Sequence, residues 1–444
     1  MTAVASSRPP EASEGGSLWR NGDFLKLWLG ETLSLLGAHV THLALPLTAI
    51  SAFDATDEQV GVLRFLQLVP YLGLALLFGV WVDRARRRRL MLGANTVRMV
   101  LLALVPVLHW LDALDMVTLM AIACAVGTAS VLFDVSWMSY VPSLVRDPKQ
   151  YVEAGAKLGA GSSAADVAGP GLAGLLVAAL TAPVALIVDA FSYLVSIVSL
   201  LLIRTREPRP GPRAERSSEQ SSERPADRRH LPTELRDGLR WVFGDPVLRS
   251  LALIGFCCNF SMISVWTMFL LYGTNDVGLS PATIGGIFAA ASLGGLAGAT
   301  ISRRVIRRFP LGRVYLVSQS ALLLGPVLIA VAAGPRPVMV ALFVLSFLIT
   351  YLGLGVAGVI IVSLRQIGTP QRLMGRMTAS FRTLLFGGGA LGGLAAGLLS
   401  GGIGAGNALT VAAIASALVV VALFRSPVTR LTTMPSATGE PSAA

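Results

Sequence analysis

Charged residues are scarce in this sequence. Asp, Glu, Lys and Arg make up 14% of its 444 residues, against about 25% in a typical soluble domain, and this deficit argues against a soluble enzyme. The formal charge is +11, but with 54% hydrophobic residues nucleic acid is a poor candidate partner. Cysteine is rare too. Cys124, Cys257 and Cys258 fall in apolar stretches, where we expect packing roles rather than a disulfide framework.

Motifs of several enzyme classes are also missing. No G-x-x-x-x-G-K-[ST] phosphate loop occurs, and the lysines are Lys26, Lys149 and Lys157, so an ATP-driven pump is not indicated. Neither an H-E-x-x-H zinc motif nor a nucleophile elbow is present. We therefore expect a protein that is not an enzyme and that carries no metal and no cofactor.

Long apolar runs dominate what the sequence does contain. Twelve stretches are bounded by charges or turn residues, and at 1.5 Å per residue each is long enough to cross about 30 Å of hydrocarbon. They form two groups of six: 27–51, 58–82, 91–111, 116–140, 157–181 and 183–204, then 248–272, 280–302, 312–333, 337–363, 382–402 and 406–426. The sequence predicts an all-α membrane protein with twelve transmembrane helices in two pseudo-symmetric six-helix bundles.

The basic residues predict the orientation of the chain. Lys and Arg accumulate in short cytoplasmic loops, and all 36 of them except Arg64, Arg98 and Arg336 fall in segments that are cytoplasmic if both termini lie inside. Arg64 and Arg98 lie within spans, and Arg336 lies in an outer loop. We expect a multi-pass protein of the plasma membrane with both termini in the cytoplasm.

The same pattern divides the chain into six parts. The segment between the bundles is built of Arg, Glu, Ser and Pro, which is typical of a flexible linker. The residues after it place Leu235, Leu239, Val242 and Phe243 on one helical face, which predicts an amphipathic helix on the inner membrane surface. The parts are a cytoplasmic N-terminal tail (1–23), the first bundle (24–204), the linker (205–232), the interfacial helix (233–246), the second bundle (247–427) and a cytoplasmic C-terminal tail (428–444).

Two segments of the first half recur in the second half. The run from Phe78 to Arg88 lines up with the run from Ala297 to Arg304, and both carry a glycine four residues before an acid or a serine and then arginine. The segment from Gly169 to Gly174 lines up with the segment from Gly392 to Gly397. Internal symmetry of this kind is typical of transporters.

The first repeated segment resembles the G-x-x-x-D-R-x-x-R-R motif of the major facilitator superfamily. The matching residues are Gly79, Asp83, Arg84, Arg87 and Arg88. Further stretches, including Phe133-Asp134 and Asp189-Ala190, are similar to the enterobactin-exporter and macrolide-efflux branch, and the resemblance covers about residues 18–430. It implies two bundles that rock about a central cavity lined by the first, fourth, seventh and tenth spans, and export of a small molecule against protons.

Physical arguments support a gating role for this motif. Asp83 lies at the cytoplasmic edge, where a facing helix N-terminus would favour its charge, and the implied fold places the start of the eleventh span nearby. Gly79 would permit close helix approach. We expect the motif to latch the two halves together. The alternative is that the arginines only fix the orientation of the chain.

The fifth span carries a partial match to the G-x-x-x-G-P-x-x-G-G antiporter motif of drug exporters. Gly169, Pro170 and Gly174 match it, whereas Ala165 and Ala173 replace two of its glycines. Pro170 removes one helical hydrogen bond and the glycines permit tight packing. We expect a bend at the bundle interface, with generic helix packing as the alternative.

Ionisable residues inside spans need a partner or a function. By depth we expect Arg98 to pair with Asp134, which has Arg87 and Arg88 as alternative partners, and Arg64 to pair with Asp189. Asp166 has no Lys or Arg at its depth, so it is our candidate for proton coupling, with Glu31, Asp134 or a neutral packing role as alternatives. The complete set lies in the first half: Glu31, His39, His42, Arg64, Arg98, Asp134, Asp166 and Asp189.

The expected cavity combines two histidines with neutral groups. His39 and His42 share one face of the first span, where they provide polar groups, pack against polar neighbours or, least favoured, ligate a metal. The second half offers Asn259, Trp266, Phe269 and Tyr351, for which a lipid-facing or core position is the alternative. Walls of this kind favour an amphipathic, largely apolar substrate.

The sequence therefore predicts a secondary active transporter. Stated most concretely, we expect a monomer in the lipid bilayer that exports a small amphipathic molecule in exchange for protons by alternating access. The molecule is a drug, an antibiotic or a siderophore-like compound. A proton-coupled importer and a non-transporting receptor on the same fold are the alternatives.

Overall fold

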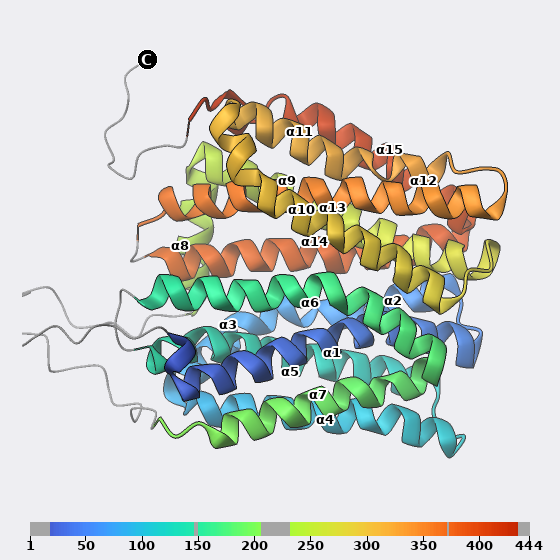
Figure 1. The fold of residues 1–444 in the computed structure, drawn as a ribbon, viewed down its shortest axis with the longest axis horizontal. Coiled ribbons are helices and arrows are strands. Elements are labelled where there is room, and N and C mark those ends of the chain that lie inside the picture. The colour runs from blue at the N-terminus through green and yellow to red at the C-terminus, as the bar shows by residue number, and fades with distance from the viewer. Residues whose placement is uncertain (1–17, 146–149, 206–230, 371–372, 434–444) are drawn as a thin grey trace, which may run out of the picture.

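The computed structural model describes residues 18–145, 150–205, 231–370 and 373–433. Within these ranges the chain is helical and contains no β-strand. Eleven helices are long and apolar enough to cross a membrane, and they run along the long axis of the molecule (Figure 1). The first and last described residues lie at the same end of this axis, which we call the termini end, and the other end is called the opposite end.

The first half of the chain begins with a short 3-10 turn, η1 (Leu18–Arg20), and continues with seven helices. These are α1 (Gly22–Phe53), α2 (Asp57–Leu68), α3 (Pro70–Arg84), α4 (Arg87–Trp110), α5 (Met116–Leu144), α6 (Gln150–Leu180) and α7 (Ala182–Leu202). The second half contains α8 (Leu231–Gly244), α9 (Pro246–Leu271), α10 (Pro281–Arg308), α11 (Leu311–Leu324), α12 (Val327–Ala330), α13 (Arg336–Ile367), α14 (Met374–Ile403) and α15 (Ala405–Leu423), with the short turns η2 (Tyr272–Asp276) and η4 (Pro427–Arg430).

Two of the predicted spans are broken at prolines. The span predicted at 58–82 consists of α2 and α3, which meet at Val69 because Pro70 has no N–H to continue the helical ladder. The span predicted at 312–333 is broken in the same way at Pro326, between α11 and α12. The prediction of an all-α membrane fold is confirmed, and the crossing made of α2 and α3 accompanies the eleven long helices.

The helices of each half pack chiefly on one another. In the first half α1 contacts α6 and α7, and α4 contacts α5 and α7. In the second half α9 contacts α14 and α15, whereas α13 contacts α10 and α11. The main contacts between the halves are α2 with α14 and α6 with α10 (Figure 1). These two helix pairs form the main interface between the halves.

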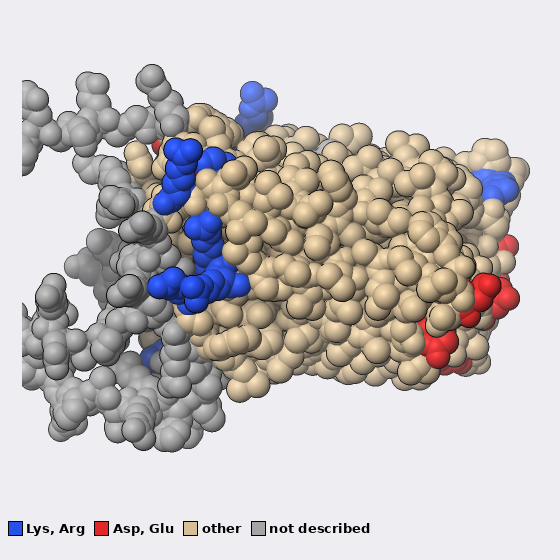
Figure 2. All heavy atoms as spheres, turned by 90° about the horizontal axis from the view of Figure 1, so that it is seen from below, with Lys and Arg blue, Asp and Glu red and all other residues tan. Residues whose placement is uncertain are grey.

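Charge is distributed unevenly between the two ends of the molecule. Figure 2 shows most of the visible Lys and Arg side chains close to the termini end, a broad uncharged middle, and the visible Asp and Glu side chains concentrated at the opposite end. Apolar side chains that face outward along the length of the helices, such as Leu175, Phe191 and Leu418, are more than half exposed. A bilayer can cover such a surface, whereas water would leave it exposed at a cost.

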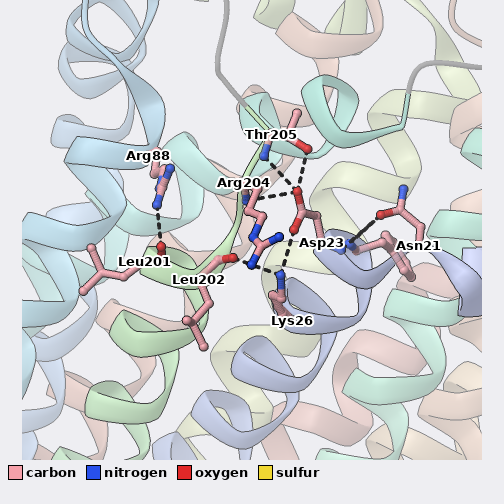
Figure 3. A network of polar contacts seen from close by, with 9 residues as sticks. Asn21, Asp23, Lys26, Arg88, Leu201, Leu202, Arg204 and Thr205 are labelled. Carbon is pink, nitrogen blue, oxygen red and sulfur yellow. Dashed lines mark hydrogen bonds and ion pairs between the residues drawn. The ribbon is translucent and has the colours of Figure 1, made fainter.

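A hydrogen-bond network at the termini end ties the end of α7 to the start of α1 (Figure 3). Asp23 Oδ2 accepts hydrogen bonds from the backbone N–H groups of Arg204 and Thr205, at 3.0 and 2.8 Å, and from the Thr205 hydroxyl at 2.7 Å. Lys26 Nζ donates to the carbonyl of Leu202 at 2.9 Å, and Arg88 donates to the next carbonyl, that of Leu201, at 3.0 Å. The last turn of α7 is thereby held where the first bundle ends.

We expect Asp23→Ala to lower the stability of the protein by about 2 kcal/mol, because two backbone N–H groups lose a charged acceptor. Lys26→Met is the comparison variant, since it removes an ion pair whose Lys26 side chain is 33% exposed and one hydrogen bond to the Leu202 carbonyl but leaves both backbone N–H groups with their acceptor, and exposed ion pairs contribute roughly 0–1 kcal/mol. Thermal unfolding of the detergent-solubilised variants measures both effects. Equal melting temperatures for the two variants would show that Asp23 does not hold this junction.

Helix α8 packs against protein along part of its length. Its Gly238 lies against the first turns of α14, where an added Cβ would come within 2.6 Å of Ser380 Oγ, and Val242 is fully buried. Thus the apolar face that predicts membrane binding is covered in part by α14, because this helix start supplies a complementary apolar surface. Most of the predicted linker, residues 206–230, lies outside the described residues, as do most of the N-terminal tail (1–17) and of the C-terminal tail (434–444).

Candidate functional site

A cavity of about 460 Å³ lies between the two halves of the molecule, a size typical of small-molecule sites. Four lining residues with His, Arg or Asp side chains come from the first half of the chain: His39, His42, Arg64 and Asp166. The second half contributes apolar and aromatic walls, including Trp266, Phe288 and Tyr351. Among the described residues, the charged and ionisable side chains that line this cavity therefore belong to one half.

His39 and Asp166 meet on the cavity wall. His39 Nε2 lies 3.2 Å from Asp166 Oδ1, and the side chains are 26% and 67% exposed. Gly169 makes room for this contact, because an added Cβ would come within 2.6 Å of Cγ in the His39 ring. The sequence offers no Lys or Arg at the depth of Asp166, and its partner in the structure is a histidine of another helix, α1.

Arg64 occupies the wall next to His42, away from Asp189. Arg64 Nη1 donates to Gln67 Oε1 at 2.9 Å and lies 3.5 Å from His42 Nδ1. The predicted pairing of Arg64 with Asp189 is not formed. Asp189 is fully buried and accepts hydrogen bonds from the hydroxyl groups of Thr41 and Ser192. Arg64 and Asp189 lie at equal depth in their predicted spans, which suggested a pair. Depth alone does not determine the direction in which each side chain points from its helix.

The second predicted pair, Arg98 with Asp134, is also wrong. Asp134 Oδ2 accepts hydrogen bonds from Arg382 Nη2 at 2.6 Å and from the Tyr71 hydroxyl at 3.0 Å. Arg98 donates to Asn95 Oδ1 at 3.1 Å and lies over the rings of Phe133 and Tyr193, at 4.9 and 4.4 Å from their centroids. The aromatic faces take the place of the carboxylate for this guanidinium.

Arg382 is a functional candidate that the sequence reasoning missed. The predicted span begins only at 382, which leaves Arg382 among the loop charges at its cytoplasmic boundary, whereas α14 begins at Met374 and the apolar stretch at Arg376. Arg382 is thus an intramembrane charge of the second half, which was predicted to have none. Its ion pair with Asp134 joins the two halves, and the stacked rings of Tyr71 and Phe386, with centroids 4.1 Å apart, lie beside it.

Glu31 lies on α1, two turns closer to the termini end than His39. Its Oε2 atom is buried and has no hydrogen-bond partner among the described residues. Asp134 and Arg98 are the charged groups that act on it most strongly. Glu31 therefore has a buried carboxyl oxygen without a partner among the described residues, and its role as an alternative coupling residue stays a prediction.

The motif near the end of α3 is described only in part. The side chains of Asp83 and Arg84 lie outside the described residues, so the predicted latch stays a prediction. Arg87 and Arg88 stand in the first turn of α4. In this structure no described atom of a neighbouring element lies within 4 Å of an added Cβ at Gly79, so the close helix approach expected when the latch forms stays a prediction. Its repeat counterpart, Gly298, does pack tightly, against the carbonyl of Leu352.

Two glycine pairs join the halves near the opposite end. Gly61 of α2 meets Gly397 of α14, and Gly174 of α6 meets Gly285 of α10, so closely that a Cβ on any of them would overlap the facing backbone. Gly174 and Gly397 are counterparts in the sequence repeat, and the structure places them in equivalent contacts. The predicted segment Gly169–Gly174 therefore does lie at the bundle interface, on a helix that continues through Pro170.

The predicted cavity residues of the second half divide into two groups. Trp266 and Tyr351 line the cavity, whereas Asn259 and Phe269 are not part of its lining. Phe269 is fully buried and its ring centroid lies 4.9–5.8 Å from those of Phe288, Phe343 and Phe347. Asn259 packs against α14 at Gly389. The apolar pattern of the sequence identifies the span that becomes α9, but it does not determine which face of this helix points towards the cavity.

Comparisons with known proteins agree with this architecture. The multidrug efflux pump Tap of Mycolicibacterium fortuitum is 25% identical over 400 residues, which cover 87% of this chain and 91% of that protein. A bacterial homologue of the human lysosomal transporter Spinster, solved inward-facing and unoccupied, has a TM-score of 0.69 at 17% identity and covers 96% of this chain and 100% of that one. The nucleoside transporter NupG has a TM-score of 0.70 at 12% identity, covering 91% of this chain and 98% of that one.

The two structural likenesses show a shared fold, since both identities are below 25%. The decisive match is the sequence model described as "Major Facilitator Superfamily", which spans residues 27–393. This multi-pass, all-helical membrane protein is a transporter of small molecules rather than an enzyme, and it belongs to the Major Facilitator Superfamily.

Proposed function

We propose that this transporter exports a small amphipathic molecule in exchange for protons. The observation that carries the proposal is the contact between Asp166 and His39, two groups that can each bind a proton, on the wall of the central cavity. A carboxylate that is 67% exposed there is open both to protons and to substrate. The multidrug efflux relative supports export, and the proposed branch is that of the enterobactin and macrolide exporters.

Alternating access is the proposed mechanism. The glycine pairs at the opposite end hold α2 against α14 and α6 against α10, which supports closure of the cavity at that end. Backbone contacts without side chains can part and reform without repacking a core. Rocking of the bundles 24–204 and 247–427 would separate these pairs and bring the termini-end halves of the helices together.

The proposed latch at the termini end is the motif of Gly79, Asp83, Arg84, Arg87 and Arg88. It would hold the two halves together there after this movement. We place both termini in the cytoplasm and the protein in the plasma membrane as a monomer, as the loop charges favour. In that orientation the glycine contacts lie on the outer side of the cavity, which supports a state that loads a substrate from the cytoplasm for export.

Asp166→Asn tests the coupling directly. In proteoliposomes with a trapped pH indicator, we expect addition of a transported amphipathic compound to move protons in the native protein and at least tenfold fewer in the variant, because the amide binds no proton at neutral pH. Downhill flux of the compound should continue. Asp112→Asn is the control, since Asp112 lies in an outer turn at φ 51°, a conformation that asparagine also tolerates.

Each of the other outcomes selects an alternative. Normal proton flux in Asp166→Asn would assign coupling to Glu31 or to Asp134. Movement of the substrate across the membrane in the same direction as the protons, rather than the opposite direction, would indicate the importer. Ligand-induced thermal stabilisation without any flux would indicate a receptor and would refute the proposed function.

A further inference from the structure

Four arginines stand close together where α10 ends, at the termini end of the molecule (Figure 1). Arg303 and Arg307 lie about one turn apart on one face of this helix, and Arg304 and Arg308 do so on the adjoining face. Arg313 follows in the first turn of α11, across a short connection. All five side chains are exposed. We call these five residues the arginine patch.

The arginine patch has no counter-ion among the described residues. None of its five side chains makes an ion pair or a hydrogen bond there. Asp276 is the only Asp or Glu in the sequence between residues 246 and 433. It lies in η2, just before the start of α10, whereas the arginine patch lies at the end of this helix. The second bundle therefore supplies no acid that could neutralise these guanidinium groups.

The equivalent loop of the first half is built differently. In the sequence repeat Arg307 corresponds to Arg88, which donates to the carbonyl of Leu201 at 3.0 Å. Ser302 likewise replaces the acid Asp83. Arginines in a loop also orient a membrane protein during insertion. That requirement does not demand that they gather on two adjoining faces of one helix, next to its apolar surface.

An apolar surface leads along α10 and α11 to the arginine patch. Leu293 and Ile301 are exposed and lie on the helical face that continues to Arg304. Arg304 follows Ile301 by about 5 Å along the helix axis. On α11 the exposed Val317 lies about one turn from Arg313. Acyl chains can cover these apolar side chains while a phosphate group meets the guanidinium groups at the bilayer surface.

We propose that the arginine patch binds the headgroup of an anionic phospholipid, whose acyl chains lie along α10 and α11. Guanidinium groups form bidentate hydrogen bonds with phosphate oxygens, and basic clusters next to membrane helices attract anionic lipids. The linker is a poor occupant, because residues 206–230 carry seven arginines and five acids and are themselves positive. The site lies on the outer surface, so it does not depend on the proposed export function.

Native mass spectrometry of the purified, delipidated full-length protein tests the site with two lipids of the same acyl chains. We expect phosphatidylglycerol to bind at least about tenfold more tightly than phosphatidylcholine. Arg303→Gln combined with Arg307→Gln should weaken phosphatidylglycerol binding at least about fivefold and change phosphatidylcholine binding less than about twofold. Replacing both arginines by lysine keeps the charge, so this variant should lose less affinity than the glutamine variant.

Arg86→Gln combined with Arg89→Gln is the matched control. It removes the same charge from two exposed arginines of the equivalent first-half loop, and it should change phosphatidylglycerol binding less than about twofold. Melting curves give a second readout, since a ligand of the folded state raises the melting temperature. Phosphatidylglycerol should stabilise the native protein and the control more than it stabilises the glutamine variant, and inorganic phosphate should stabilise none of them.

Four results would overturn the inference. Equal affinities for the two lipids would remove the preference for an anionic headgroup, and equal losses in the glutamine variant and the control would indicate attraction by net charge alone. Stabilisation by inorganic phosphate would indicate a site for the free anion. A glutamine variant less stable than the native protein in phosphatidylcholine would indicate that a segment of this chain covers the arginine patch. Transport enters none of these measurements, so a failure of the export proposal would not affect them.

Discussion

Gly285→Leu is expected to open the cavity at the opposite end of the molecule. Gly285 and Gly174 meet backbone to backbone, so an isobutyl group at position 285 does not fit between the two helices. It would overlap the backbone of Gly174 and crowd the carbonyl oxygen of Pro170. Overpacking of this kind costs about 1–3 kcal/mol or more, and each 1.4 kcal/mol shifts a two-state population roughly tenfold. The variant should therefore populate the state in which α6 and α10 are apart.

A cysteine at Met262, a cavity-lining position, can report this shift in a protein whose three native cysteines are replaced. We expect a membrane-impermeant maleimide, added in the vesicle orientation that exposes the opposite end, to react at least about tenfold faster in Gly285→Leu. Gly286→Leu is the control, because an added Cβ there has no neighbouring atom within 4 Å among the described residues. The same labelling rate in both variants would mean that the glycine contact does not close the cavity.

Arg382→Met is expected to destabilise the protein by about 2 kcal/mol, because it leaves the partly buried carboxylate of Asp134 without its cation. Adding Asp134→Asn removes that unpaired charge, so the double variant should be more stable than Arg382→Met alone. Transport should be impaired in both, since the ion pair joins α5 to α14 across the two halves. Thermal unfolding and substrate flux measure the two effects.

Arg365→Met provides the matched comparison for this cycle. Arg365 lies on α13 and stacks on Phe381 of α14, with its guanidinium 4.3 Å from the ring centroid, so its contact stays within the second half. Asp134→Asn should not rescue the stability of this variant. Additive effects of Arg382→Met and Asp134→Asn on the free energy of unfolding would contradict an ion pair that stabilises the contact between α5 and α14.

The composition and apolar runs of the sequence were sufficient for the fold class. A span of about 20 apolar residues satisfies its own backbone hydrogen bonds as a helix, so membrane helices follow from local sequence. The broken crossing at Pro70 and the broken helix at Pro326 were beyond that argument, since hydropathy averages over the break. The repeat was also visible in the sequence, and Gly174 and Gly397 make the equivalent contacts that it suggests.

The candidate site was predicted in part. His39, His42, Asp166, Trp266 and Tyr351 do line one cavity, because ionisable and aromatic residues on inward-facing spans have few other places to lie. The assigned pairs failed. A depth along the helix axis is a single coordinate, whereas a contact also requires both helices to turn the residues towards each other.

By itself the sequence determined that this protein is a bundle of membrane helices with polar groups confined to a few positions, because burial in lipid imposes that pattern locally. Only the tertiary structure decided which of those groups meet. Asp134 finds Arg382 across the interface, Asp166 finds His39, and Trp266 covers Arg64. Partners of this kind depend on how helices far apart in the chain are rotated and how they cross. Close contacts such as those between glycine faces set this geometry, and the hydropathy pattern of a single span does not contain it.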